Sequence, residues 1–110
     1  DGGIIGDATV DFVRQFKVDI AVIGISGIDE DGDLLDFDYQ EVRVAQTIVD
    51  HSRQIFLAAD HSKFGRNAMI RMGNIGNATH LFTDQSPPES VIRVMKERDV
   101  QLVLATQPLE

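Results

Sequence analysis

The chain has 110 residues, of which 43% are hydrophobic and 25% charged, and it contains no cysteine. These values are typical of one globular domain, or of part of one, in a reducing compartment, and no apolar run approaches the roughly 20 residues that span a bilayer. Eighteen acidic against ten basic residues give a net charge of −8, which argues against direct contact with nucleic acid because phosphate binding needs a basic face.

The first half of the chain predicts a helix, a strand and a second helix. Asp7 can cap a short helix with apolar residues at helical spacing. The β-branched run V-D-I-A-V-I-G-I (18–25) predicts a strand buried on both faces. A turn-rich loop follows, and Asp38 with Glu41 forms a capping-box pattern that predicts a helix to about His51.

The second half continues this alternation. Q-I-F-L-A-A (54–59) predicts a strand, which an irregular basic segment follows, and H-L-F-T-D (80–84) predicts another. The segment 86–89, S-P-P-E, predicts a helix start with proline in the first turn, and the helix runs to about residue 98, before a last strand at 100–104. Strands that alternate with helices predict an α/β fold with parallel, Rossmann-like βαβ layers.

Polar residues follow the first two strands at their carboxyl ends, where open α/β sheets bind ligands. If these strands are neighbours, residues 24–29 and 60–66 lie at one edge of the sheet, and the helix that follows the first loop starts there too. Carboxylates accept hydrogen bonds from hydroxyls and cations hold phosphate, so this edge suits a small polyol phosphate. The candidate ligands are Asp29, Glu41, Asp60 and Lys63, with Arg66 nearby.

Each candidate also has a purely structural interpretation. Glu41 can complete the capping box, Asp29 can bond its own turn, and Asp60 can cap the segment after its strand. Arg66 and Arg71 can be solvated surface charges. Lys63 has the strongest position, between a serine and a phenylalanine at a strand end.

Other motifs are absent or incomplete. G-I-S-G-I-D (24–29) lacks the G-x-G-x-x-G spacing of dinucleotide sites and the G-x-S-x-G pattern of a nucleophile elbow. The three histidines have no partner at metal-ligand spacing. We therefore expect neither a metal nor a cofactor.

Three stretches carry a resemblance: G-I-S-G-I-D-E-D-G (24–32), the helix start at Glu41, and A-D-H-S-K-F-G-R-N-A-M (59–69). They resemble the effector-binding domain of the DeoR family of bacterial transcriptional repressors, over the chain up to about Leu104. The resemblance implies that residues 1–106 are the C-terminal part of a cytoplasmic sensor domain. The terminal Leu109 and Glu110 have the composition of a vector remnant, so we expect 107–110 to be a tail with vector residues. A winged helix-turn-helix that binds operator DNA would belong to the missing N-terminal part, and the protein would be a homo-oligomer.

The extension R-N-A-M (66–69) and the run F-D-Y-x-E-V-R (37–43) resemble family members whose effector is sn-glycerol 3-phosphate. The family's fold is similar to ribose-5-phosphate isomerase, which implies that Lys63 contacts phosphate. Gly27 and Asp29 match the isomerase's G-A-D-E loop, Asp60 begins its D-x-S-K segment, and Glu41 stands at its catalytic glutamate.

Departures from the isomerase pattern favour a sensor over an enzyme. Ser26 replaces an aspartate, and L-L-D-F-D (34–38) replaces a K-G-G-G loop whose cation would stabilise an enediolate. The family's main phosphate loop would lie upstream of residue 1, so this chain would hold half of the pocket. The alternatives are a fragment of a sugar-phosphate isomerase and an oligomerisation module with a vestigial cleft.

Overall fold

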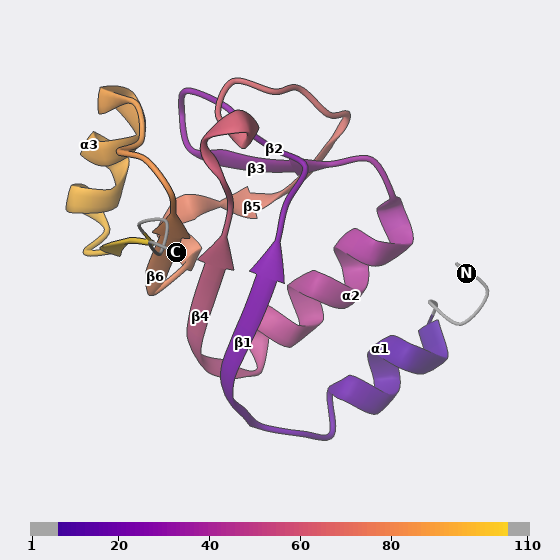
Figure 1. Cartoon of the computed structure of the whole chain (residues 1–110). Helices are drawn as coiled ribbons and strands as arrows, with labels where there is room; N and C mark the ends of the chain where they lie inside the picture. The colour runs from indigo at the N-terminus through magenta and orange to yellow at the C-terminus, as the bar shows by residue number, and fades with distance from the viewer. Residues whose placement is uncertain (1–6, 106–110) are drawn as a thin grey trace, which may run out of the picture.

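A computed structural model describes residues 7–105 of the chain. Their largest unit is a parallel sheet with the strand order β1-β4-β6-β7 (Figure 1). Its strands are β1 (Val18–Gly24), β4 (Ser52–Ala58), β6 (His80–Thr83) and β7 (Gln101–Leu104). The α/β fold with a parallel, Rossmann-like sheet is therefore confirmed. None of the helices in this described part is both long and apolar enough to cross a membrane.

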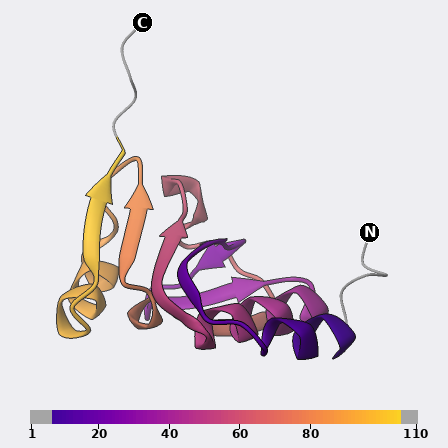
Figure 2. The same cartoon turned by 90° about the horizontal axis from the view of Figure 1, so that it is seen from below.

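The helices begin close to the predicted positions, and they are α1 (Asp7–Val13), α2 (Tyr39–Asp50) and α3 (Glu89–Glu97). The Asp38 carboxylate caps α2 by accepting hydrogen bonds from the backbone amides of Gln40 and Glu41, at 2.9 and 3.1 Å. Pro88 stands just before α3 rather than in its first turn, and it caps the helix without a side-chain hydrogen bond. Figure 2 shows α1 beside α2, with which it is in contact.

A second, antiparallel sheet was not predicted from the sequence. It consists of β2 (Gly27–Ile28), β3 (Asp33–Asp36) and β5 (Ile70–Asn74), in the order β2-β3-β5. Two short 3₁₀ helices, η2 (His61–Lys63) and η3 (Ile75–Asn77), flank β5 in the chain. These strands are short and β3 has aspartate at both ends, so they lack the apolar alternation that marks a strand in a sequence.

The hydrophobic core lies on one face of the parallel sheet. Val42 from α2 and Val91 and Met95 from α3 belong to the same buried cluster, which places both helices on this face. Val91 and Met95 are 1% and 3% exposed, whereas Ile92 between them is only partly buried. The largest fully buried side chains are Ile28, Leu34, Leu57, Ile75, Leu81 and Val91.

The opposite face of the parallel sheet is apolar and uncovered within residues 7–105. In β1 only Ala21 and Ile23 are buried, whereas Ile20 and Val22 are 48% and 69% exposed. Burial of this strand on both faces, as its composition predicts, is therefore wrong for the described residues. Phe56 and Phe82 lie on the same open face, with ring centroids 5.0 Å apart. Figure 1 shows the end of α2 behind β1, and no element in front of β1 and β4.

Candidate functional site

The carboxyl ends of β1 and β4 lie side by side, because Gly24 pairs with Ala58 in the parallel register. The loops that follow both strands therefore meet at one edge of the sheet, as the sequence predicts. An open groove of about 400 Å³ lies at this edge, at the ends of β4, β6 and β7. Its lining residues are Ala58, Ala59, Asp60, Lys63, Phe82, Thr83, Asp84 and Ala105.

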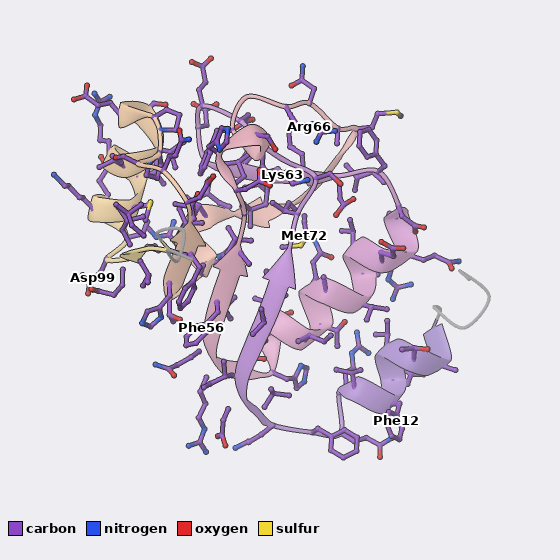
Figure 3. The ribbon with its side chains drawn as sticks, in the orientation of Figure 1. Phe12, Phe56, Lys63, Arg66, Met72 and Asp99 are labelled. Atoms are coloured by element: carbon purple, nitrogen blue, oxygen red, sulfur yellow. The ribbon has the colours of Figure 1, made fainter. Side chains whose placement is uncertain are left out.

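Lys63 ends the short helix η2, directly after β4 (Figure 3). Asp60 caps this turn: its Oδ1 accepts a hydrogen bond from the Ser62 backbone amide at 2.9 Å and another from the Ser62 hydroxyl. These bonds lower the pKa of Asp60, and the charge of Lys63 lowers it further. Asp60 thus has the capping role that the sequence left open, and the turn it stabilises holds half-buried Lys63 in the groove.

Asp84 is a groove residue that the sequence analysis did not single out. It follows β6 and accepts two hydrogen bonds from His61, from the backbone amide to Oδ1 and from Nδ1 to Oδ2, both at 2.7 Å. The hydrogen bond with His61 is the main cause that lowers the pKa of Asp84. The sequence could have indicated Asp84, because it stands at the carboxyl end of a third predicted strand, where ligands bind in such sheets.

Asp29 lies outside this groove and stabilises its own turn. Its Oδ1 accepts hydrogen bonds from the backbone amides of Asp31 at 3.0 Å and Asp33 at 2.9 Å. It also lines a smaller pocket of about 130 Å³ between β2, the segment after η2 and the start of α3. The turn role that the sequence left open for Asp29 is therefore present, and a role in ligand binding stays a prediction.

Gly27 brings the two polar segments together. A Cβ atom at this position would lie 2.3 Å from the carbonyl oxygen of Arg66, so only glycine allows this approach. The backbone amide of Gly65, at φ +87°, donates to the Ile28 carbonyl at 2.8 Å and fixes the same contact. The Arg66 side chain is exposed and, among the described residues, forms no ion pair.

Glu41 is exposed in the first turn of α2 and does not line the groove. Of the six candidate residues, the structure therefore places Asp60 and Lys63 in the groove, and it brings Gly27 and Arg66 into contact with each other. Ligand roles for Glu41 and Arg66 stay predictions. Within residues 7–105, no three His, Asp or Glu side chains are grouped so that they could hold a metal ion.

Arg71 is not a free surface charge, although the sequence favoured that interpretation. Its Nε lies 3.0 Å from Oδ1 of Asp33. Asn74 donates to the same carboxylate oxygen at 3.1 Å, and this bond is the main cause that lowers the pKa of Asp33, with Arg71 adding to it. The ion pair joins β3 to β5 and stabilises the second sheet. Arg71 therefore has a structural role.

Comparison with known proteins decides the family. The family model of the DeoR C-terminal sensor domain matches residues 1–85. The chain belongs to the DeoR sensor-domain family. This match includes the loops after β1 and β4, and therefore Lys63 and Asp60 in the groove of the sensor domain.

Three curated relatives of this chain are named as repressors. The chain is 54% identical over 104 residues to the glycerol-3-phosphate regulon repressor of Escherichia coli (strain K12), which covers 94% of the chain and 41% of that protein. It is 51% identical to the protein of the same name from Haemophilus influenzae, over 94% of the chain and 40% of the relative. It is 36% identical to the HTH-type transcriptional repressor CsqR of E. coli, with the same coverage. The chain thus spans about two fifths of the length of these relatives.

Proposed function

We propose that this chain is the C-terminal part of the ligand-sensing domain of a DeoR-type transcriptional repressor of glycerol metabolism, and that sn-glycerol 3-phosphate is its inducer. The observation that carries the proposal is the position of Lys63, which lies in an open groove at the carboxyl edge of the parallel sheet. The groove of about 400 Å³ has room for a small phosphorylated polyol. The identity of 54% to a glycerol-3-phosphate regulon repressor supports the choice of ligand.

Lys63 would contact the phosphate, because its ammonium group is the cation that lines this groove among the described residues. Asp60 would hold the turn that carries Lys63, and its second oxygen remains available to a hydroxyl group of the ligand. Gly27 would keep the loop after β1 against this turn. Residues outside the chain would complete the pocket, since the relatives are more than twice as long.

The protein would be a sensor and not an enzyme. In an isomerase-like reaction a cation must stabilise the enediolate, and the sequence already lacks the glycine-rich, basic loop for this task. The structure supports the same conclusion, since residues 34–36 lie in β3, which pairs with β2 on one side and with β5 on the other, and Asp38 caps α2. An extended strand in the middle of a sheet has no freedom to fold over a substrate.

The longer protein would be a cytoplasmic homo-oligomer that contacts operator DNA through an N-terminal domain, as the relatives' names as repressors suggest. The net charge of −8 supports the view that DNA binding belongs to another part of the protein. The apolar face of the parallel sheet is uncovered within residues 7–105, although parallel sheets are normally buried on both faces. Another part of the longer protein, or a second copy of it, would cover this face.

Isothermal titration calorimetry with sn-glycerol 3-phosphate tests the proposal on the longer protein that contains this chain. We expect binding, and we expect Lys63→Ala to weaken it by about 1.5–3 kcal/mol, the range for a hydrogen bond to a charged group. Lys96→Ala, at an exposed position of α3 away from the groove, is the matched control and should bind as the wild type does.

Two results would contradict the proposal. The first is no binding of sn-glycerol 3-phosphate by the wild-type protein. The second is equal loss of affinity in the Lys63 and Lys96 variants, since this would reflect general electrostatics rather than a specific contact. Turnover of ribose 5-phosphate would identify an isomerase instead.

A further inference from the structure

The charges that line the groove do not favour an anion by themselves. Asp60 and Asp84 contribute two carboxylates, and Lys63 contributes one ammonium group. Lys63 lowers the pKa of Asp60 while Asp84 raises it, so these three groups lie close enough to act on one another. A phosphate monoester carries about −1.5 to −2 charges at pH 7, so a groove with a net charge of −1 would oppose it.

His61 supplies the compensating charge. Both oxygens of Asp84 bind this one residue, at 2.7 Å to its backbone amide and at 2.7 Å to its Nδ1. The hydrogen bond and the charge of Asp84 raise the pKa of His61, and Asp60 raises it further. His61 does not itself line the groove, so it acts on the groove through Asp84.

The same contact fixes the shape of the turn. His61 is the first residue of η2 and Lys63 is the last, so the bonds from His61 to Asp84 anchor η2 to the end of β6. Asp60 caps η2 from the other side. Asp60 and Asp84 therefore fix the position of Lys63 indirectly, through their hydrogen bonds to other residues of the same turn.

We propose that His61 is a positioning and charge-compensating residue of the groove, which binds a phosphate more tightly when His61 carries a proton. The inference rests on the proposed function, since it assigns a regulation to the same site. The charges of Asp60, Lys63, Asp84 and protonated His61 sum to zero. Loss of the proton from His61 leaves the groove with one uncompensated negative charge.

The pH dependence has a definite sign. The folded protein holds the pKa of His61 above its ordinary value of about 6.5. The favourable contribution to phosphate binding is therefore complete at low pH and is lost as the pH rises through this raised pKa. The charged groups that act on His61 are Asp84, after β6, and Asp60, in its own turn.

The test compares wild-type protein, His61→Gln, Asp84→Asn and the double variant, by calorimetric titration with sn-glycerol 3-phosphate between about pH 5.5 and 9. Glutamine keeps an N–H donor for Asp84 but does not titrate, and asparagine keeps an acceptor for the His61 amide but has no charge. The ligand's second phosphate pKa, near 6, affects all four proteins equally. The ratio of wild-type to variant affinity therefore isolates the protein's own groups.

We expect wild type to bind about three- to fivefold more tightly than His61→Gln at low pH, the size expected for one solvent-exposed ion pair. The ratio should fall to one as the pH rises through the pKa of His61. Asp84→Asn removes the uncompensated charge, so the double variant should regain the affinity that His61→Gln alone loses. This rescue separates charge compensation from direct contact between His61 and the ligand.

A ratio of wild-type to His61→Gln affinity that is constant with pH would overturn the inference, and so would a double variant that binds no better than His61→Gln. Circular dichroism of each variant checks that it is folded. If Asp84→Asn does not fold, the pH dependence of the ratio of wild-type to His61→Gln affinity still tests the inference. Absence of binding in the wild type would instead overturn the proposed function.

Discussion

The backbone of Gly27 in β2 approaches that of Arg66 so closely that a Cβ atom on Gly27 would lie 2.3 Å from the Arg66 carbonyl oxygen. The two residues are far apart in the chain, and their contact joins the loop after β1 to the segment after η2. The Arg66 amide in turn donates to the Lys63 carbonyl at 3.3 Å. The position of Lys63 thus depends on a glycine in β2, more than 30 residues earlier in the chain.

Replacement of Gly27 by alanine should force these two backbones apart. We expect Gly27→Ala to lower the free energy of unfolding by about 1–3 kcal/mol, as for other overpacked sites, and to weaken effector binding because Lys63 shifts. Urea unfolding and calorimetric titration measure the two effects. Gly24→Ala is the matched control, because a Cβ atom there meets nothing within 4 Å. Equal stability of the Gly27 variant and the wild type would show that the contact is not tight.

The pair of Arg71 and Asp33 should make stability depend on pH in the acid range. The pKa of Asp33 is lowered in the folded protein, chiefly by Asn74 and also by Arg71. Its contribution to stability is therefore present above its ordinary pKa of about 3.9 and is lost as the pH falls through the lower pKa of the folded state. We expect Arg71→Gln to lower the free energy of unfolding by about 0.5–1 kcal/mol at pH 7, since Arg71 is 62% exposed and solvent screens the pair.

Urea unfolding at a series of pH values measures this dependence. The difference between wild type and Arg71→Gln should vanish once Asp33 is protonated in the folded protein. Arg53→Gln is the control, because Arg53 lies 3.8 Å from Asp19 with both side chains largely exposed, and it should cause no measurable change. A difference for Arg71→Gln that does not decrease as the pH is lowered through the acid range would contradict the role of the ion pair.

Asp99 ends α3 in a conformation that suits glycine better. Its φ is 59°, the Val100 amide donates to the Met95 carbonyl at 2.8 Å, and the Asp99 amide donates to the Lys96 carbonyl at 3.3 Å. These two bonds form a Schellman motif, whose left-handed residue is usually glycine. Figure 3 shows Asp99 in the turn between α3 and β7.

We expect Asp99→Gly to raise the free energy of unfolding by about 0.5–1 kcal/mol, since glycine relieves the left-handed strain and removes a negative charge from a helix C-terminus. Asp99→Asn is the control that removes the charge and keeps a side chain, and it should give a smaller gain. Urea unfolding of the three proteins at pH 7 measures both. A glycine variant less stable than the wild type would show that the Asp99 side chain stabilises the turn.

Local patterns in the sequence were sufficient to predict the strands of the parallel sheet and the helices between them. A β-branched run predicts β1, and an aspartate before an amphipathic stretch predicts the start of α2 at Asp38, because strand burial and helix capping depend on neighbouring residues. The position of Lys63 at a strand end also follows from the sequence, since parallel strands that are linked by helices share the edge at which their carboxyl ends meet.

Only the tertiary structure decided the partners of these residues. Four features each join residues more than 20 positions apart: the pairing of β3 with β5, the contact of Gly27 with Arg66, the ion pair of Arg71 with Asp33, and the hydrogen bonds of His61 with Asp84. Such contacts depend on how loops return to the sheet, and no local period in the sequence records that path. The positive charge of residues 59–71 is therefore divided by the fold, which places Lys63 in a groove and Arg71 in an ion pair and leaves Arg66 at the surface.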